Sequence, residues 1–136
     1  MRSYLIDVGQ NGDLDLIAEL AQPDMVDEAN QVFGGSPGRD GLVEHVVGFR
    51  RNVTDSTVTI REIVAGEHHV MAWWEFDGVH TGPWLGEAPT GDALHGTVFS
   101  FFRLRDHLIN HYRLWLHAGF AEPVVFDSST GELRRA

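Results

Sequence analysis

The hydrophobic pattern of this chain changes its period once, near Asn52, and that change limits the folds open to it. Before this point the apolar residues recur at helical spacing. After it, runs of β-branched and aromatic residues follow one another with short turn signals between them. Helices followed by a series of strands are typical of an α+β domain, in which helices cover one face of a curved antiparallel sheet.

Helices are expected in the first third of the chain. The first would begin near the N-terminus and end at Asn11-Gly12, and Asp13 would cap a second short helix that Pro23 stops. A third would open within residues 36–40, a Ser-Pro-Gly-Arg-Asp segment. Its predicted apolar face consists of Leu42, Val43, Val46, Val47 and Phe49.

The rest of the chain predicts strands over residues 57–64, 69–76, 97–104 and 108–117. A short last strand is expected at residues 123–126, and the polar tail from about residue 127 is expected to fray. With 136 residues and 43% hydrophobic content, the chain fits one domain, residues 1–136, with a real core.

Composition excludes several kinds of chemistry. The chain has no cysteine, so thiol nucleophiles, disulfides and cysteine metal sites are absent. All ten basic residues are arginine, and without lysine neither a Schiff base nor a P-loop is available. The net charge of −10 argues against nucleic acid and anionic membranes as partners. No apolar run is long enough to span a bilayer and no signal peptide is recognisable, so we expect a cytoplasmic protein.

The histidines do not predict a metal site. His68 and His69 are adjacent and would point to opposite faces of a strand. His111 and His117 would lie about 20 Å apart at a strand rise of ~3.3 Å per residue. The glycines do not form a dinucleotide fingerprint either. We therefore expect neither metal nor cofactor.

The segment His80–Gly91 predicts the rim of a pocket. A histidine ends one strand, and a loop rich in glycine and proline then carries Trp84 toward the next strand. His80 shares a strand face with Trp74 and Phe76 by period two. The alternative is that His80 is a loop histidine bonded to a backbone carbonyl, which is the commoner role of a single histidine.

The strand over residues 108–117 has two unlike faces. One carries His111, Arg113, Trp115 and His117, and the other carries Asn110, Tyr112, Leu114 and Leu116. The polar face could be open to solvent with the leucines in the core, or it could line a polar pocket. The tryptophan among charged groups favours the pocket. On that interpretation His117, assisted by His80 and the carboxylate of Glu28, would be the proton-transfer group.

Five segments together resemble a known family: Gly12–Asp15, Pro23–Asp27, Gly38–Leu42, Trp74–Gly91 and Phe102–Asp106. They resemble the SnoaL-like polyketide cyclases of the nuclear transport factor 2-like superfamily, and the Trp74–Gly91 block is the most specific. The resemblance implies a cone-shaped α+β fold, with a curved antiparallel sheet wrapped around N-terminal helices, a deep apolar pocket and commonly a homodimer formed through the sheet. We place that dimer contact on Trp73, Tyr112, Leu114 and Leu116.

Two positions depart from the family pattern. His117 stands where the family has a catalytic aspartate, and Glu28 stands where the family has a histidine. The resemblance therefore implies either the same proton transfer with reversed partners or a different ring closure.

Our leading hypothesis is a cofactor-independent cyclase that closes a ring in an apolar polyketide-type intermediate, by acid–base or shape-driven, Diels–Alder-like catalysis. The alternatives are an epoxide-opening cyclase or hydrolase of the same fold and a non-catalytic small-molecule binding module. The residues expected to bind the substrate are Trp74, Trp84, Trp115, Phe33, Ser100, Phe102 and Arg113.

Overall fold

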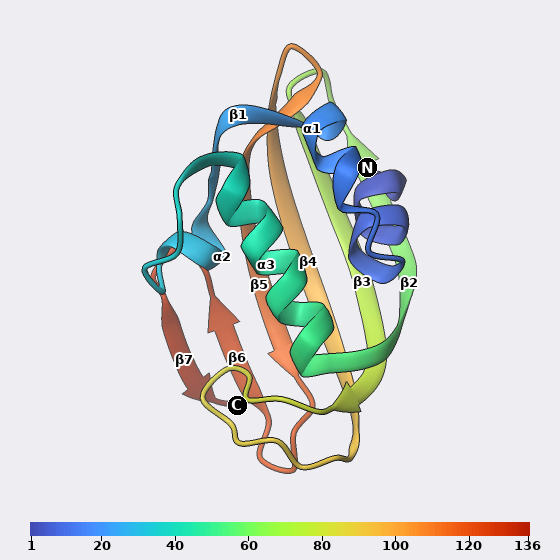
Figure 1. The fold of residues 1–136 in the computed structure, drawn as a ribbon, viewed down its shortest axis with the longest axis vertical. Coiled ribbons are helices and arrows are strands. Elements are labelled where there is room, and N and C mark those ends of the chain that lie inside the picture. Colours follow the sequence, from blue (N-terminus) through green and yellow to red (C-terminus); the bar gives the residue numbers. More distant parts are fainter.

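A computed structural model describes residues 1–136 as a layer of helices on one side of a curved sheet (Figure 1). The helical layer contains a first helix at Ser3–Gln10, a short helical turn at Leu14–Leu16, α1 at Ile17–Leu20, α2 at Glu28–Gln31 and α3 at Gly38–Asn52. The strands are β1 at Ala21–Asp27, β2 at Val53–Ala65, β3 at His69–His80, β4 at Ala93–Arg105, β5 at Leu108–Ala118, β6 at Val124–Asp127 and β7 at Glu132–Arg135. No helix is long and apolar enough to cross a membrane.

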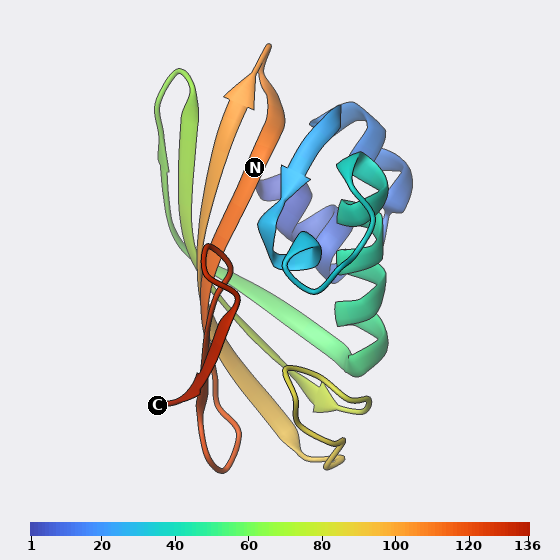
Figure 2. The same cartoon turned by 90° about the vertical axis from the view of Figure 1, so that its left-hand side faces the viewer.

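The sheet is continuous but not closed into a barrel. Its strands run in the order β2-β3-β4-β5-β6-β7, each antiparallel to its neighbour, and β1 joins β5 in parallel. Figure 2 shows the long strands curving so that their concave side faces α3 and the N-terminal helices. The antiparallel α+β fold predicted from the change of period is therefore confirmed.

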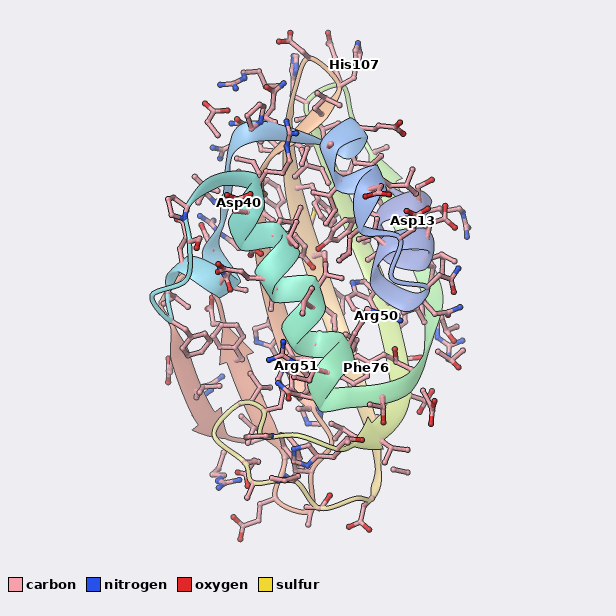
Figure 3. All side chains as sticks on the ribbon, in the orientation of Figure 1. Asp13, Asp40, Arg50, Arg51, Phe76 and His107 are labelled. Atoms are coloured by element: carbon pink, nitrogen blue, oxygen red, sulfur yellow. The ribbon has the colours of Figure 1, made fainter.

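The core lies between α3 and the concave face. Alternate residues of each central strand point inward, as period two requires, and Phe76 on β3 lies behind α3 (Figure 3). Gly96 is the cross-strand partner of Phe76, and a Cβ there would lie 2.2 Å from the Phe76 ring, so this position has no room for a side chain. The buried residues that form the inner wall include Ala72, Val98, Phe102, Tyr112, Leu114 and Leu116.

The convex face carries a row of aromatic residues from three strands. Trp73 stacks on Phe99 with ring centroids 6.0 Å apart, and Phe99 meets Trp115 edge-on at 5.9 Å. All three are exposed to solvent. The predicted dimer surface is thus wrong for Tyr112, Leu114 and Leu116, which are buried inside, and right only in placing Trp73 outside. The homodimer itself stays a prediction, which light scattering of the purified protein would test.

Two local predictions are also wrong. The second helix ends at Leu20, before Pro23, because residues 21–27 form β1, and the side chain of Asp13 makes no capping hydrogen bond. Pro23 lacks an N–H, and the register of β1 on β5 is interrupted between Ala21 and Val26. The tail does not fray throughout, because β7 pairs with β6.

Candidate functional site

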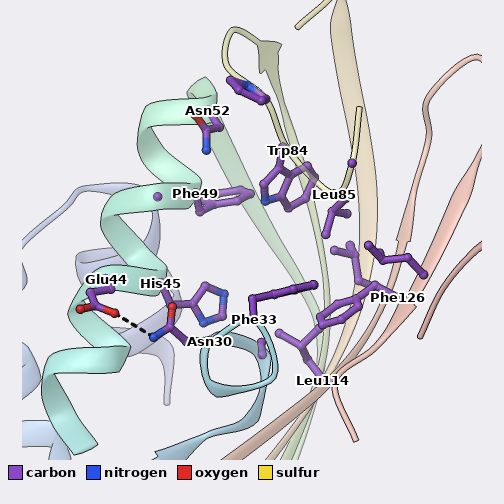
Figure 4. Close-up of a pocket in the computed structure, with 16 residues that line it drawn as sticks. Asn30, Phe33, Glu44, His45, Phe49, Asn52, Trp84, Leu85, Leu114 and Phe126 are labelled. Carbon is purple, nitrogen blue, oxygen red and sulfur yellow. Dashed lines mark hydrogen bonds between the residues drawn. The ribbon is translucent and has the colours of Figure 1, made fainter. Parts of the chain in front are cut away.

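Two neighbouring pockets lie between α3, the concave face of the sheet and the loop of residues 81–92. The outer pocket has a volume of about 330 Å³ and the inner one about 60 Å³. Figure 4 shows the outer pocket, with α3 along one wall and Trp84 opposite Phe49. Both pockets are lined by the same central group, His45, Phe49, Trp84, Leu114 and Leu116.

His45 reaches both pockets because it lies on the inward face of α3. Leu42, His45, Val46 and Phe49 follow the i, i+3, i+4, i+7 spacing of one helix face, and Leu42 and Val46 are buried. A titratable imidazole therefore stands in an otherwise apolar stripe.

Asp27 holds this imidazole. Its carboxylate, which has no solvent-exposed area, lies with Oδ2 at 2.7 Å from Nδ1 of His45. The other oxygen, Oδ1, accepts a hydrogen bond from the backbone N–H of Ala29 at 3.2 Å and so caps α2. Because an ionised carboxylate only accepts hydrogen bonds, Nδ1 of His45 carries a proton, and Nε2 of the neutral ring keeps its lone pair.

The environment makes His45 a stronger base than an ordinary histidine. Burial alone would lower its pKa, but the charge of Asp27 and the hydrogen bond from Nδ1 to Asp27 outweigh burial, and the pKa of His45 is raised. The one side-chain hydrogen bond of His45 is made through Nδ1, so Nε2 has no partner in the protein. The side chain keeps 26% of its area exposed, so a guest in the pockets can reach it. This is the arrangement that a general base requires.

The wall of the inner pocket opposite α3 carries a short hydrogen-bonded chain. Nε1–H of Trp74 donates to Oγ of Ser100 at 2.9 Å, and that oxygen lies 2.9 Å from the hydroxyl of Tyr112. The Tyr112 ring is 5.9 Å from the His45 ring. Burial raises the pKa values of both Tyr112 and Tyr4, so both phenols are neutral at ordinary pH.

Aromatic rings shape the outer pocket. Trp84 on the loop meets the rings of Phe49 at 5.6 Å and Phe76 at 5.7 Å. At the mouth, Phe33 stacks on Phe126 at 5.3 Å and is 59% exposed. Apart from His45, polar groups of this pocket include Asn30 and Glu44, and Asn30 donates to Glu44 at 3.0 Å (Figure 4).

The predicted residues of the site divide into two groups. Trp74, Trp84 and Phe33 line the pockets, and Ser100 bonds Trp74 from the wall behind them. Phe102 is fully buried against Tyr4 and Tyr112 and supports the wall without lining it.

His117, Arg113 and Trp115 do not line the cavity, so their predicted placement is wrong. The two faces of β5 were separated correctly, but the inner one is the Tyr112–Leu114–Leu116 face, which packs under α3. The polar face points outward, because there arginine can remain solvated and Trp115 can join the aromatic row.

Glu28 does not meet His80 or His117 either. Its carboxylate bonds Nε2 of His111 at 2.6 Å and the Arg113 guanidinium at 3.0 Å, and it accepts from the Ser128 hydroxyl at 3.2 Å. Burial would raise the pKa of Glu28, but these hydrogen bonds and charges lower it. The cluster ties α2 to β5 on the outside of the sheet.

His80 lies in a different place again. It is 1% exposed, packs on Phe120 at 5.1 Å, and has Nδ1 at 3.4 Å from Oγ1 of Thr90. It borders a separate polar pocket of about 400 Å³ at the end of β3 and the start of β4, and not the pockets of His45. The predicted trio of Glu28, His80 and His117 is therefore not assembled.

Sequence reasoning missed Asp27, His45 and Tyr112. Asp27 was visible only as part of the Pro23–Asp27 segment, and Tyr112 was placed on the predicted outer dimer surface with Leu114 and Leu116. The available signal was His45 itself, at i+3 from Leu42 and i−4 from Phe49 on an apolar helix face. The structure contains no group of three or more histidine, aspartate or glutamate side chains suited to a metal ion.

Comparison with known proteins identifies the kind of fold that holds these residues. A family model described as SnoaL-like polyketide cyclase matches residues 1–117. No curated protein matches the sequence. Among solved structures, TsrD from Streptomyces laurentii superposes with a TM-score of 0.73 at 18% identity, over 85% of this chain and 83% of TsrD.

Two further structures agree. A candidate SnoaL-like polyketide cyclase from Jannaschia sp. CCS1 gives a TM-score of 0.70 at 20% identity, covering 83% of this chain and 80% of its own. IdmH from Streptomyces antibioticus, a candidate polyketide cyclase, gives a TM-score of 0.64 at 26% identity, covering 85% of this chain and 86% of its own.

Proposed function

Because the chain belongs to the SnoaL-like polyketide cyclase family, we propose that it is a cofactor-independent cyclase in which His45, held by Asp27, transfers the proton. The observation that carries the proposal is the Asp27–His45 pair, in which the carboxylate is buried and the histidine lines both pockets. An apolar polyketide-type intermediate is the class of substrate that such a lining suits.

The reaction needs only one base and one substrate. Nε2 of neutral His45 removes a proton from an acidic C–H of the folded substrate, and the electron pair left behind attacks a carbonyl carbon in the same molecule. A C–C bond forms, the carbonyl π bond breaks, and the resulting alkoxide takes the proton back from His45. Product and substrate are isomers, so no oxidant, reductant or co-reactant is consumed.

The pockets contribute by folding the substrate. Trp84, Phe49 and Phe33 surround the outer pocket and restrict the conformations of a flexible chain within it. Holding two reacting groups of one molecule together can supply roughly 7–11 kcal/mol of the barrier. The Asp27 carboxylate stabilises the imidazolium that forms during the proton transfer.

A probe reaction tests the base without knowledge of the natural substrate. 5-Nitrobenzisoxazole is a small apolar aromatic compound that opens to a coloured phenolate when a base removes one C–H proton. We expect the protein to catalyse this opening, and His45→Ala to lower kcat/KM by about 10²–10⁴-fold, as loss of general base catalysis does. His117→Ala, on the convex face, is the matched control and should change it by less than about threefold.

The same variants are then assayed for ring closure, with poly-β-ketone intermediates generated in situ by a reconstituted polyketide synthase. Loss of closure in His45→Ala and not in His117→Ala supports the proposal. Wild-type closure by His45→Ala would contradict it and would favour a shape-driven, pericyclic closure. Binding of these intermediates without any turnover would favour a binding module.

A further inference from the structure

Trp74, Ser100 and Tyr112 form a hydrogen-bonded chain beside the inner pocket, and this chain has more donor hydrogens than hydrogen bonds. Trp74 offers one indole N–H, Ser100 one O–H and Tyr112 one O–H, which makes three protons. Only two contacts join these groups, Trp74 to Ser100 and Ser100 to Tyr112. Because the indole can only donate, Ser100 must accept from it, and one of the two hydroxyl protons has no acceptor in the protein.

Burial decides which hydroxyl keeps the spare proton. Ser100 is buried and does not line either pocket, so a free O–H there would point into packed side chains. Tyr112 lines the inner pocket. The satisfied arrangement is therefore one in which Trp74 donates to Ser100, Ser100 donates to Tyr112, and the Tyr112 O–H is free to donate into the pocket.

The acceptor for this proton must be a guest in the inner pocket. His45 lines the same pocket with Nε2 unbonded, and its ring centroid is 5.9 Å from that of Tyr112. A hydrogen-bond donor and a base that line the same small pocket can act on the two ends of one short unit, a carbonyl oxygen and the hydrogen on the carbon beside it. The inner pocket, of about 60 Å³, admits little more than such a unit.

We propose that Tyr112, oriented by Ser100 and Trp74, donates a hydrogen bond to the oxygen of an enolisable ketone while His45 removes the proton from its α-carbon. This inference rests on the proposed function and narrows its substrate class to ketones that close through an enolate. As the C–H bond breaks, its electrons form a C=C bond and the carbonyl π electrons move to oxygen, where the Tyr112 O–H stabilises the negative charge. The proton stays on His45 until the product alkoxide takes it.

In this scheme Tyr112 is a catalytic residue and Ser100 and Trp74 are positioning residues. A neutral phenol is suited to the task because it donates to an enolate oxygen without giving its proton away. Burial, which raises the pKa of Tyr112, keeps it in this form.

Phenols of graded acidity are suitable probes, because a bound phenol resembles an enolate in placing a partly charged oxygen on a flat apolar framework. Binding of substituted phenols, followed by calorimetry and by the absorbance of the bound phenolate, needs no turnover. We expect affinity to rise with the acidity of the phenol. Tyr112→Phe should weaken the most acidic phenol by about tenfold, the typical loss of a hydrogen bond to a charged oxygen.

The role of Ser100 in orienting the Tyr112 O–H is tested by plotting the binding affinity of each phenol against its acidity and comparing the slopes of the variants. Ser100→Ala should flatten this slope, because a misoriented O–H no longer responds to charge on the guest, and Ser100→Thr should restore it. A merely structural defect would weaken every phenol equally and leave the slope unchanged. His117→Ala is the control and should keep both affinity and slope.

The outcomes separate this inference from the proposed function. Wild-type phenol binding in Tyr112→Phe, or loss of the slope in Tyr4→Phe instead, would overturn the role of Tyr112 while the His45-dependent opening of 5-nitrobenzisoxazole stands. A Tyr112-dependent slope with no His45-dependent turnover would support the oxyanion site and overturn the cyclase.

Discussion

Asp27 and Glu28 are neighbours in the chain, and each binds a histidine, but they build two different regions of the molecule. Asp27 ends β1 with its carboxylate inside the fold, against His45 on α3. Glu28 begins α2 with its carboxylate outside, against His111 and Arg113 on β5. The inner pair borders a cavity, and the outer one does not.

The difference lies in whether the histidine of the cluster lines a pocket. The Glu28 carboxylate is fully engaged by His111, Arg113 and Ser128, and no group there faces a pocket. His45 bonds Asp27 through Nδ1 only, its Nε2 has no partner in the protein, and the residue lines the pockets. A histidine–carboxylate pair therefore indicates catalysis only where the histidine also lines a pocket that a guest can enter.

The largest contrast is expected from replacing the two carboxylates. Asp27→Asn removes the charge that supports the imidazolium, and it should lower kcat/KM for 5-nitrobenzisoxazole by about 10²-fold, the lower end of what general base catalysis contributes. Glu28→Gln should change it by less than about threefold. Equal losses in both variants would show that the two clusters do not differ in function.

The pH profile should separate the clusters next. His45 must be neutral to act as a base, so kcat/KM should rise with pH through a pKa above the usual histidine value of about 6.5. In Asp27→Asn burial acts without the opposing charge, and the rising limb should move to lower pH. Glu28→Gln should leave the limb in place. Titration of the His45 ring by nuclear magnetic resonance gives the same pKa independently, and an unshifted limb in Asp27→Asn would refute the pairing.

Stability should show what the outer cluster contributes to the fold. Glu28→Ala leaves Arg113 and His111 without their partner and should lower the free energy of unfolding by about 1–3 kcal/mol, measured by urea denaturation. Glu122→Ala, at an exposed position, is the control and should have little effect. Retained turnover in the destabilised Glu28→Ala protein would confirm that the outer cluster serves the fold.

The smallest expected effect is on the stability of the fold at low pH. The pKa of Glu28 is lower in the folded chain than its ordinary value, so its contribution to stability is present above about pH 4.5 and is lost as pH falls through the folded value. His45 acts in the reverse direction: its raised pKa adds stability that is complete below about pH 6.5 and is lost as pH rises. Thermal unfolding should therefore show that Glu28→Gln flattens the acid side of the profile. A change confined to the alkaline side would contradict this assignment.

Much of the fold was predictable because it depends on local periodicity. The spacing of Leu42, Val46 and Phe49 predicts α3 and its buried face, and the β-branched runs predict the central strands. The site was less predictable, because its members come from segments that meet only after folding. Trp74, Trp84 and Phe33 were found, whereas Asp27, His45 and Tyr112 were missed.

Sequence by itself determined the class of the fold, the excluded chemistry and the division of each strand into two faces, since these follow from residue types and from periods of 2 and 3.6. Only the tertiary structure decided which face of β5 turns inward, because alternation is symmetric until α3 covers one side. It also decided that Asp27, and not Glu28, bonds a histidine that lines the pockets. The chain changes from strand to helix at these two residues, so their carboxylates lie on opposite sides of the sheet. No local sequence pattern indicates which of the two sides contains the pockets.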